Sequence, residues 1–281
     1  MMLLLLACTT PTGDEPDTGA ADSGADTAES AETGDSADTA DTDTGEAAPP
    51  FAGLHLSPPG LVDPSLPYWA RVADAAARTG GVVFVDPSNG PGTSEIEAWS
   101  TAVADARFAG ARVVGFVDTD GGTRDAGDVE RDLGRWFAWY EVDGAWFDTE
   151  GATDCAAATA AHAVSAAEAD SRDDDDDALV AVRTAFDCEG LTAFAELVVV
   201  SEPFTAFTAR SPWPWAATVG PERLVAWVTA VPPGQEEAAL TQARALGFGH
   251  VWITDQSGAE PFGVEPQGLD AVMALVLGAP G

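Results

Sequence analysis

The chain has 281 residues, with 47 acidic residues against 12 basic ones, and its formal net charge at pH 7 is −35. Nucleic acids and anionic lipid surfaces bind proteins through a basic surface, so this charge balance argues against both as partners. The charge balance is compatible with neutral and cationic partners.

The first residues, 1–8, are apolar but far too few to span a bilayer, which takes about 20 apolar residues. Leu5-Leu6-Ala7-Cys8 resembles the lipobox of bacterial lipoprotein signals, in which the cysteine receives the lipid. The basic residues expected ahead of such a run are missing, which is compatible with a true start upstream of Met1. We therefore expect an exported bacterial lipoprotein of the cell envelope or cell surface, anchored to the membrane only through lipid on Cys8. A chance leucine run is the alternative.

The next segment, residues 9–50, consists almost entirely of Asp, Glu, Thr, Ala, Gly, Ser and Pro, with 12 acidic residues and no aromatic residue. Such a composition cannot bury enough apolar surface to offset the entropy of ordering the chain. We predict a disordered linker with a mean reach of about 35–40 Å, which would hold the folded part away from the membrane.

The remaining residues, 51–281, have the composition of one barrel-sized folded domain. They contain eight short apolar runs, at 53–56, 82–85, 113–117, 145–147, 179–182, 197–200, 225–228 and 251–253. Continuous apolar character, rather than alternation, is typical of parallel strands that are covered on both faces. Segments with helical spacing separate most of the runs, at 68–78, 95–108, 128–140, 155–168, 236–246 and 269–277.

Eight strand and helix units predict a (β/α)8 barrel, with a doubly wound open sheet as the rival. The weakest unit is the sixth, because only a short helix around 191–194 fits between its strand and the one before. Two cysteines, Cys155 and Cys188, are left as a pair if Cys8 carries lipid. In an exported protein they predict a disulfide, with two reduced, buried cysteines as the alternative.

Five apolar runs end in a carboxylate, either directly or one residue later: Asp86, Asp118, Asp148, Glu202 and Asp255. In a parallel barrel these strand ends open onto one face, where active sites are built. Helix capping explains some of these acids, but Asp86 and Glu202 are each followed by proline and open no helix at once. Clustered carboxylates suit glycosidic cleavage, in which one group protonates the leaving oxygen and another acts as nucleophile or base.

Motifs at the strand ends resemble those of one family. Asp86-Pro87-Ser88-Asn89-Gly90-Pro91-Gly92 resembles the Asn-Pro-x-x-Gly-Pro-Gly loop of the spherulin-4-like glycoside hydrolases, the spherulation-specific family. Further blocks follow in family order, at 115–124, 143–148, 198–202 and 252–255. The resemblance implies a (β/α)8 barrel that cleaves α-1,4-linked galactosamine-containing exopolysaccharide, as biofilm-degrading relatives do.

The resemblance also implies site residues. Asp148 and Glu202 match the family's catalytic carboxylates, and by analogy with other barrel glycosidases we expect Asp148 as nucleophile and Glu202 as acid/base. The family's adjacent Asp-Glu pair is Asp148-Thr149-Glu150 here, so we count Glu150 as a third catalytic candidate. The expected substrate-binding residues are Asp86, Asn89, Asp118, Thr119, Asp120, Arg124, Trp146 and Asp255.

Other kinds of site are not indicated. The three histidines are scattered and fit structural roles, and we find no metal-ligand spacing and no nucleotide-binding loop, so we expect no cofactor. The acidic cleft favours a cationic, partly de-N-acetylated polymer as substrate for a monomeric enzyme. The second hypothesis is a catalytically inactive barrel lipoprotein that binds glycan.

Overall fold

The computed structural model describes residues 48–60, 63–65, 67–172, 178–185, 187–258 and 261–278. All of these belong to one compact unit, which spans residues 46–281. Cys8 and almost all of the segment 9–50 lie outside the described residues. Among the helices that are described, none combines the length and apolar character needed to cross a membrane.

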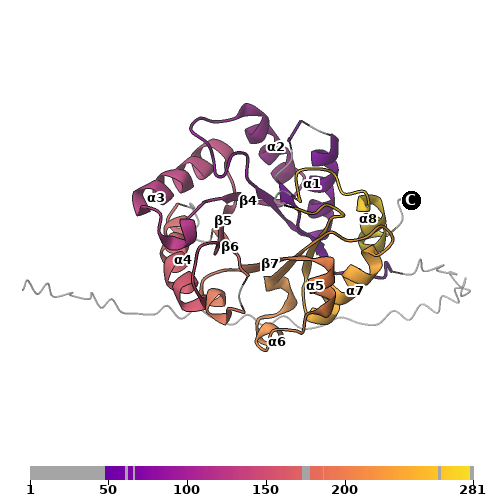
Figure 1. Ribbon diagram of the computed structural model, residues 1–281. Helices are drawn as coiled ribbons and strands as arrows, with labels where there is room; N and C mark the ends of the chain where they lie inside the picture. The colour runs from indigo at the N-terminus through magenta and orange to yellow at the C-terminus, as the bar shows by residue number, and fades with distance from the viewer. Residues whose placement is uncertain are drawn as a thin grey trace, which may run out of the picture. The chain divides into compact units, whose positions relative to one another are not determined.

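The centre of the fold is a ring of parallel strands (Figure 1). In the described residues these are β1 (His55–Leu56), β2 (Pro59–Gly60), β3 (Val82–Val85), β4 (Arg112–Phe116), β5 (Gly144–Asp148), β6 (Leu179–Arg183), β7 (Leu197–Pro203), β8 (Leu224–Thr229) and β9 (His250–Ile253). From β2 to β9 each strand pairs with the next strand along the chain. β1 pairs with β9 and β2 pairs with β3, so the segment 55–60 joins the two ends of the sheet. The predicted (β/α)8 barrel is confirmed, and the open sheet is excluded.

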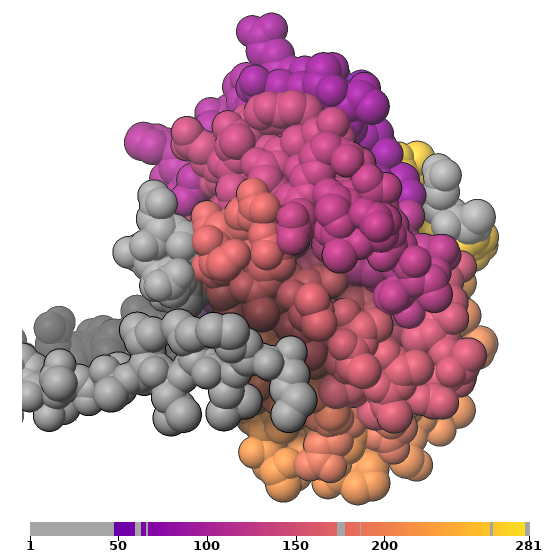
Figure 2. All heavy atoms as spheres, turned by 90° about the vertical axis from the view of Figure 1, so that its left-hand side faces the viewer, coloured from indigo at the N-terminus to yellow at the C-terminus, as the bar shows by residue number. Residues whose placement is uncertain are grey.

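Helices surround the ring in Figure 1. They are α1 (Pro67–Thr79), α2 (Glu97–Phe108), α3 (Ala126–Arg135), α4 (Cys155–Asp170), α5 (Phe204–Ala209), α6 (Ala216–Val219), α7 (Glu236–Leu246) and α8 (Leu269–Leu277). Local signals fix several of their ends: the Asp154 side chain accepts the amide of Ala157 at the start of α4, and Gly247 ends α7 with φ +86°. Figure 2 views the side of the molecule on which α3 and α4 cover the strands.

Two segments differ from the expected helices. The segment predicted as one helix at 128–140 is α3 followed by a π-helical turn, Trp136–Tyr140. The Trp136 ring of this wider turn lies against Gly115 of β4, where a β-carbon would come within 2.2 Å of the ring. The position of Trp136 therefore requires a glycine at this point of β4. Between β6 and β7 the described residues form a 3-10 helix, Glu189–Ala193, in place of the short helix expected around 191–194. This difference agrees with the weakness of that unit in the sequence.

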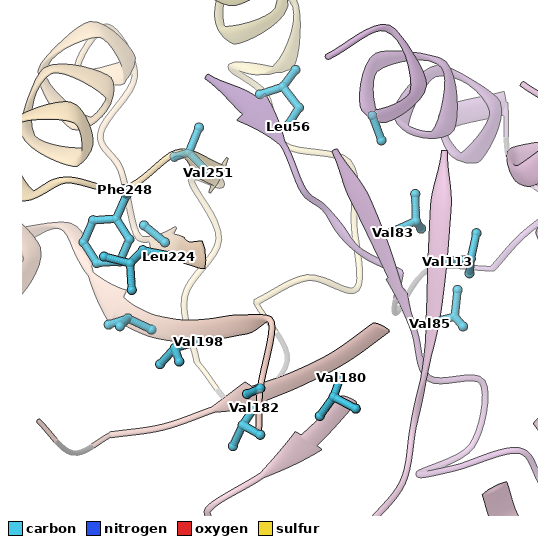
Figure 3. Close-up of a cluster of buried hydrophobic side chains, with 14 of the residues drawn as sticks. Leu56, Val83, Val85, Val113, Val180, Val182, Val198, Leu224, Phe248 and Val251 are labelled. Carbon is cyan, nitrogen blue, oxygen red and sulfur yellow. The ribbon is translucent and has the colours of Figure 1, made fainter. Parts of the chain in front are cut away.

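The buried side chains of the strands form two cores. The inner core fills the barrel, where Phe84 of β3 and Trp146 of β5 both contact Trp227 of β8, at ring-centroid distances of 5.0 and 5.7 Å. These strands are not neighbours in the sheet, so the three rings meet across the barrel. The outer core lies between strands and helices, and Figure 3 shows part of it, including Val83, Val85, Val180, Val182 and Val198. Alternate residues along each strand therefore point to opposite cores.

A disulfide links the start of α4 to the loop after β6. Cys155 and Cys188 are bonded, with their Cα atoms 5.2 Å apart, as the sequence predicts. The bond ties the outer layer to the strand ends on the side of the barrel where β5 and β6 finish.

Candidate active site at the carboxyl ends of the strands

A pocket of about 870 Å³ opens at the carboxyl ends of β3 to β6. Five of its lining residues are acidic and one, Arg183, is basic. The lining consists of Asp86, Pro87, Ser88, Asn89, Phe116, Asp118, Asp120, Trp146, Asp148, Glu150, Gly151, Arg183 and Gly263. Five of the eight expected substrate-binding residues thus lie in one pocket with the catalytic candidates Asp148 and Glu150.

Strand alternation explains which side chains reach this pocket. Phe84, Phe116, Trp146 and Ala181 all belong to the inner core. The residue two positions after each of them points the same way and stands at the mouth of the barrel. Those four residues are Asp86, Asp118, Asp148 and Arg183, and all four line the pocket.

Asp148 is the most constrained acid of the pocket. Its carboxylate forms an ion pair with Arg183, which lies directly opposite it on β6, and only 14% of the Asp148 side chain is exposed. The second oxygen, Oδ1, accepts the amide of Glu150 at 3.0 Å. The guanidinium of Arg183 also lies over the Trp146 ring, 5.7 Å from its centroid. These contacts hold an ionised carboxylate in one orientation at the pocket wall.

Arg183 is not among the site residues predicted from the sequence. The signal was present, because the run at 179–182 ends in a charged residue just as the neighbouring runs do. Burial lowers the pKa of Arg183, while the charge of Asp86 opposes that shift. Arg183 therefore interacts with carboxylates on two sides of the pocket.

A buried histidine supports the backbone of Asp148 from behind. The ring of His162, on α4, lies between the carbonyl oxygens of Ala158 (2.7 Å from Nδ1) and Asp148 (3.0 Å from Nε2). The hydroxyl of Thr119 lies 3.0 Å from Nε2 and 3.5 Å from the Asp148 carbonyl. Burial lowers the pKa of His162, and its contacts give the ring a role in supporting the backbone.

Asp86 begins a loop that is fastened to the rest of the barrel. Its Oδ1 accepts a hydrogen bond from the amide of Gly90 at 2.7 Å. The Tyr140 hydroxyl donates a hydrogen bond to the carbonyl of Pro91, and the Arg135 side chain donates one to the carbonyl of Gly92. Burial raises the pKa of Asp86 above 3.8, although loop amides and the charge of Arg183 oppose the shift.

Asp118 organises the neighbouring loop. Its Oδ1 accepts the amide of Asp120 at 2.9 Å, and its Oδ2 accepts the side-chain amide of Asn89 at 3.3 Å. Arg124 donates to the Asp118 carbonyl but pairs through its charge with Asp132. Arg124 and Thr119, both expected to bind substrate, do not line the pocket and stabilise its loops instead.

Two of the expected acids face away from the pocket. Glu202 lies beside Val228 of β8, an outer-core residue, and its carboxylate pairs with Arg210, which in turn lies over the Trp213 ring at 4.3 Å. At the end of β7 it is Ser201 that faces the region of Asp148. Asp255 accepts hydrogen bonds from the Gln267 amide and the Gln256 side chain. The structure thus does not place Glu202 beside Asp148 in the pocket.

Metal binding has no support in the described part of the chain, where no group of three or more His, Cys, Asp and Glu side chains is arranged to hold an ion.

Comparison with protein-family models finds one matching family. The model of the spherulin-4 family, described as spherulation-specific family 4, matches residues 59–276. No curated protein matches the sequence significantly.

The comparison with solved structures finds distant similarities. A GH18 chitinase from Pseudoalteromonas aurantia has 10% sequence identity, with 71% of this chain and 93% of that chain covered at a TM-score of 0.45. Phosphonopyruvate hydrolase has 15% identity, with 72% and 75% covered at 0.44. A putative chitinase A from Streptomyces coelicolor has 11% identity, with 71% and 79% covered at 0.41. Likenesses this distant carry no argument about activity.

Proposed function

The chain belongs to the spherulation-specific family 4, and on that basis we propose that it is a glycoside hydrolase that cleaves an amino-sugar exopolysaccharide at the mouth of its barrel. The single observation that carries the proposal is the pocket, in which five carboxylates from three strand ends surround one arginine and an aromatic floor. Glycosidic cleavage requires two carboxyl groups in different protonation states on either side of the bond.

Asp148 is the carboxylate that faces the anomeric carbon in this proposal. Its ion pair with Arg183 keeps it charged, and its hydrogen bond from the Glu150 amide fixes its orientation. A charged, oriented carboxylate stabilises the positive charge that develops on the sugar ring in the transition state, or attacks it as a nucleophile. Phe116 and Trp146 form the apolar part of the floor, against which the carbon face of a sugar ring can pack.

The charge of the pocket supports a cationic substrate. Five acids against one arginine make a site that attracts the ammonium groups of a partly de-N-acetylated α-1,4-linked galactosamine polymer. Binding of that polymer should weaken as salt is added, whereas binding of the fully acetylated polymer should respond little. Equal affinities for both polymers at all ionic strengths would remove the charge argument.

Release of reducing ends from the purified polymer tests the enzymatic proposal. We expect the wild-type protein to release them and Asp148→Asn to lower the rate by roughly 1,000-fold or more, with binding retained. The control is Asp255→Asn, which changes a carboxylate at another strand end that does not line the pocket. If wild type binds the polymer but releases nothing, the enzymatic proposal is wrong.

A catalytically inactive glycan-binding barrel is the second candidate. Two observations favour it: the carboxylate of Asp148 is already engaged by Arg183, and the spacing Asp148-Thr149-Glu150 departs from the family's adjacent acids. Binding without reducing-end release by wild type and Asp148→Asn alike would support this candidate.

Export and lipid anchoring remain a proposal of their own, based on Cys8. Fatty-acid labelling of the protein in a bacterial host should mark the wild type and leave Cys8→Ser unlabelled. Label on neither protein would contradict the anchor without affecting the proposed activity.

A further inference from the structure

We propose that Asp86 is the proton donor of this pocket, in place of Glu202 and Glu150. The inference rests on the proposed function, since a proton donor needs a glycosidic bond to cleave. It concerns a residue at which the chain departs from its family, because the resembling loop begins with asparagine where this chain has Asp86.

The position of Asp86 is set by the barrel. It follows Phe84 of the inner core by two residues, as Asp148 follows Trp146, so both side chains point inward at the mouth and line the same pocket. β3 and β5 are separated only by β4, so their backbones are roughly 10 Å apart. Both side chains point inward from these positions, and two-carboxylate glycosidases hold their carboxyls roughly 5–9.5 Å apart.

Arg183 links the two acids electrostatically. It forms the ion pair with Asp148, and its charge also acts on Asp86. The same guanidinium therefore contacts one carboxylate directly and acts on the other only through its charge.

The environment of Asp86 favours its neutral form. The carboxyl is half-buried among the other pocket acids, and this burial raises its pKa despite the loop amides and Arg183. Asp118, Asp120, Asp148 and Glu150 add negative charge to the same pocket, against the single positive charge of Arg183. Asp86 and Asp148 thus differ in the sense that acid-assisted cleavage requires: burial raises the pKa of one carboxyl, and the other is paired with a guanidinium.

The two alternatives have the wrong surroundings. Glu202 faces the outer core and is paired with Arg210, so it does not reach the pocket. Glu150 lines the pocket, but its side chain is exposed to solvent at the rim.

The proposed reaction is hydrolysis of the glycosidic bond. The Asp86 carboxyl gives its proton to the glycosidic oxygen while the bond from that oxygen to the anomeric carbon breaks, and the bonding electrons leave with the oxygen. The ionised Asp148 faces the positive charge that develops on the anomeric carbon. Water then supplies the hydroxyl group on that carbon and a proton that restores the starting state of the site.

Leaving-group dependence provides the test, because a leaving group that is already a stable anion needs no proton. The substrates are the purified polymer and the 4-nitrophenyl and 2,4-dinitrophenyl α-glycosides of a galactosamine trisaccharide. Asp86→Asn is the matched variant, since asparagine has the same shape and its Oδ1 can still accept the Gly90 amide. Glu150→Gln and Glu202→Gln test the alternatives, and thermal unfolding checks that each variant is folded.

We expect Asp86→Asn to lose about 100-fold to 10,000-fold on the polymer but less than tenfold on the dinitrophenyl glycoside, with the alkaline limb of its pH profile abolished. Glu202→Gln should match the wild type on all substrates. Full polymer activity in Asp86→Asn, or the leaving-group pattern in Glu150→Gln or Glu202→Gln, would overturn the inference while leaving the proposed function intact. A wild-type protein that cleaves none of the substrates would overturn both.

Discussion

Asp148 and Glu202 each end a strand of the same barrel and each pairs with an arginine, but the two pairs lie on opposite faces of the sheet. The pair of Asp148 and Arg183 points inward and lines the pocket. The pair of Glu202 and Arg210 points outward, where Arg210 covers the Trp213 ring and fastens the loop after β7. The same two chemical groups thus serve a candidate reaction in one place and loop stability in the other.

Removing the arginine from each pair should separate these roles. Arg183→Met keeps an apolar stem over Trp146 but leaves Asp148 without its counter-charge, and we expect kcat/KM on the polymer to fall about 100-fold to 1,000-fold. Arg210→Met should stay within threefold of wild type. Equal losses in the two variants would contradict the distinction between an inward and an outward pair.

A second comparison sets the mouth of the barrel against its opposite end. At that end, Nδ1 of His250, at the start of β9, lies 2.8 Å from the Ser57 hydroxyl in a hydrogen bond. The His250 ring also stacks on the ring of His55. Burial, aided by the charges of His55 and Arg112, lowers the pKa of His250 from 6.5 to about 3. The mouth holds charged groups, whereas this end holds a neutral base.

The lowered pKa makes stability depend on pH. Between pH 6.5 and about 3 the unfolded chain binds a proton at His250 that the folded protein does not bind, so stabilisation is complete above pH 6.5 and is lost as the pH falls. From pH 6.5 to 4.5 the loss attributable to His250 should be roughly 2–3 kcal/mol, at about 1.4 kcal/mol per unit.

Urea unfolding of wild type and His250→Gln at pH 7 and pH 4.5 measures this loss. The variant should lose less stability between the two pH values, although it is less stable at pH 7. Carboxylates titrate in both proteins, so the difference between them isolates His250. Identical losses would show that His250 takes up its proton as readily in the folded protein as in the unfolded chain.

The outward pair should matter for stability alone. Its side chains are 15% and 26% exposed for Arg210 and Glu202, so we expect each of Arg210→Met and Glu202→Gln to lower the free energy of unfolding by about 1–2 kcal/mol. A double-mutant cycle should give a coupling of about 1 kcal/mol. A coupling near zero would mean that the pair contributes nothing and that Arg210 acts through Trp213 only.

The fold could be predicted from the sequence because each strand is covered on both faces. This coverage produces apolar runs that stand out from the helical segments, and it places all runs in one parallel ring. The same feature hides the orientation of the strand ends. A run such as Val198-Val199-Val200 has no polar alternation, so nothing in it tells whether Ser201 or Glu202 will face the barrel interior.

The candidate site was therefore predictable only in part. Asp86, Asp118 and Asp148 were found because each happens to have the inward orientation, whereas Glu202 and Asp255 have the outward one. The interaction of Arg183 with Asp148 depends on the register between β5 and β6, which no short stretch of sequence reveals. Three-dimensional coordinates are needed to tell an acid of the pocket from an acid of the outer layer.

The smallest expected effect concerns His162, which connects the outer layer to the inward pair. His162→Gln would keep a donor near the Asp148 carbonyl but would lose the rigid ring between that oxygen and Ala158. We expect kcat to fall about threefold to tenfold with KM unchanged, because the backbone of Asp148 shifts slightly while the binding surface stays intact. His55→Gln, at the opposite end of the barrel, is the control and should leave both constants unchanged. If His162→Gln instead raises KM at constant kcat, the histidine shapes the binding surface and does not position Asp148.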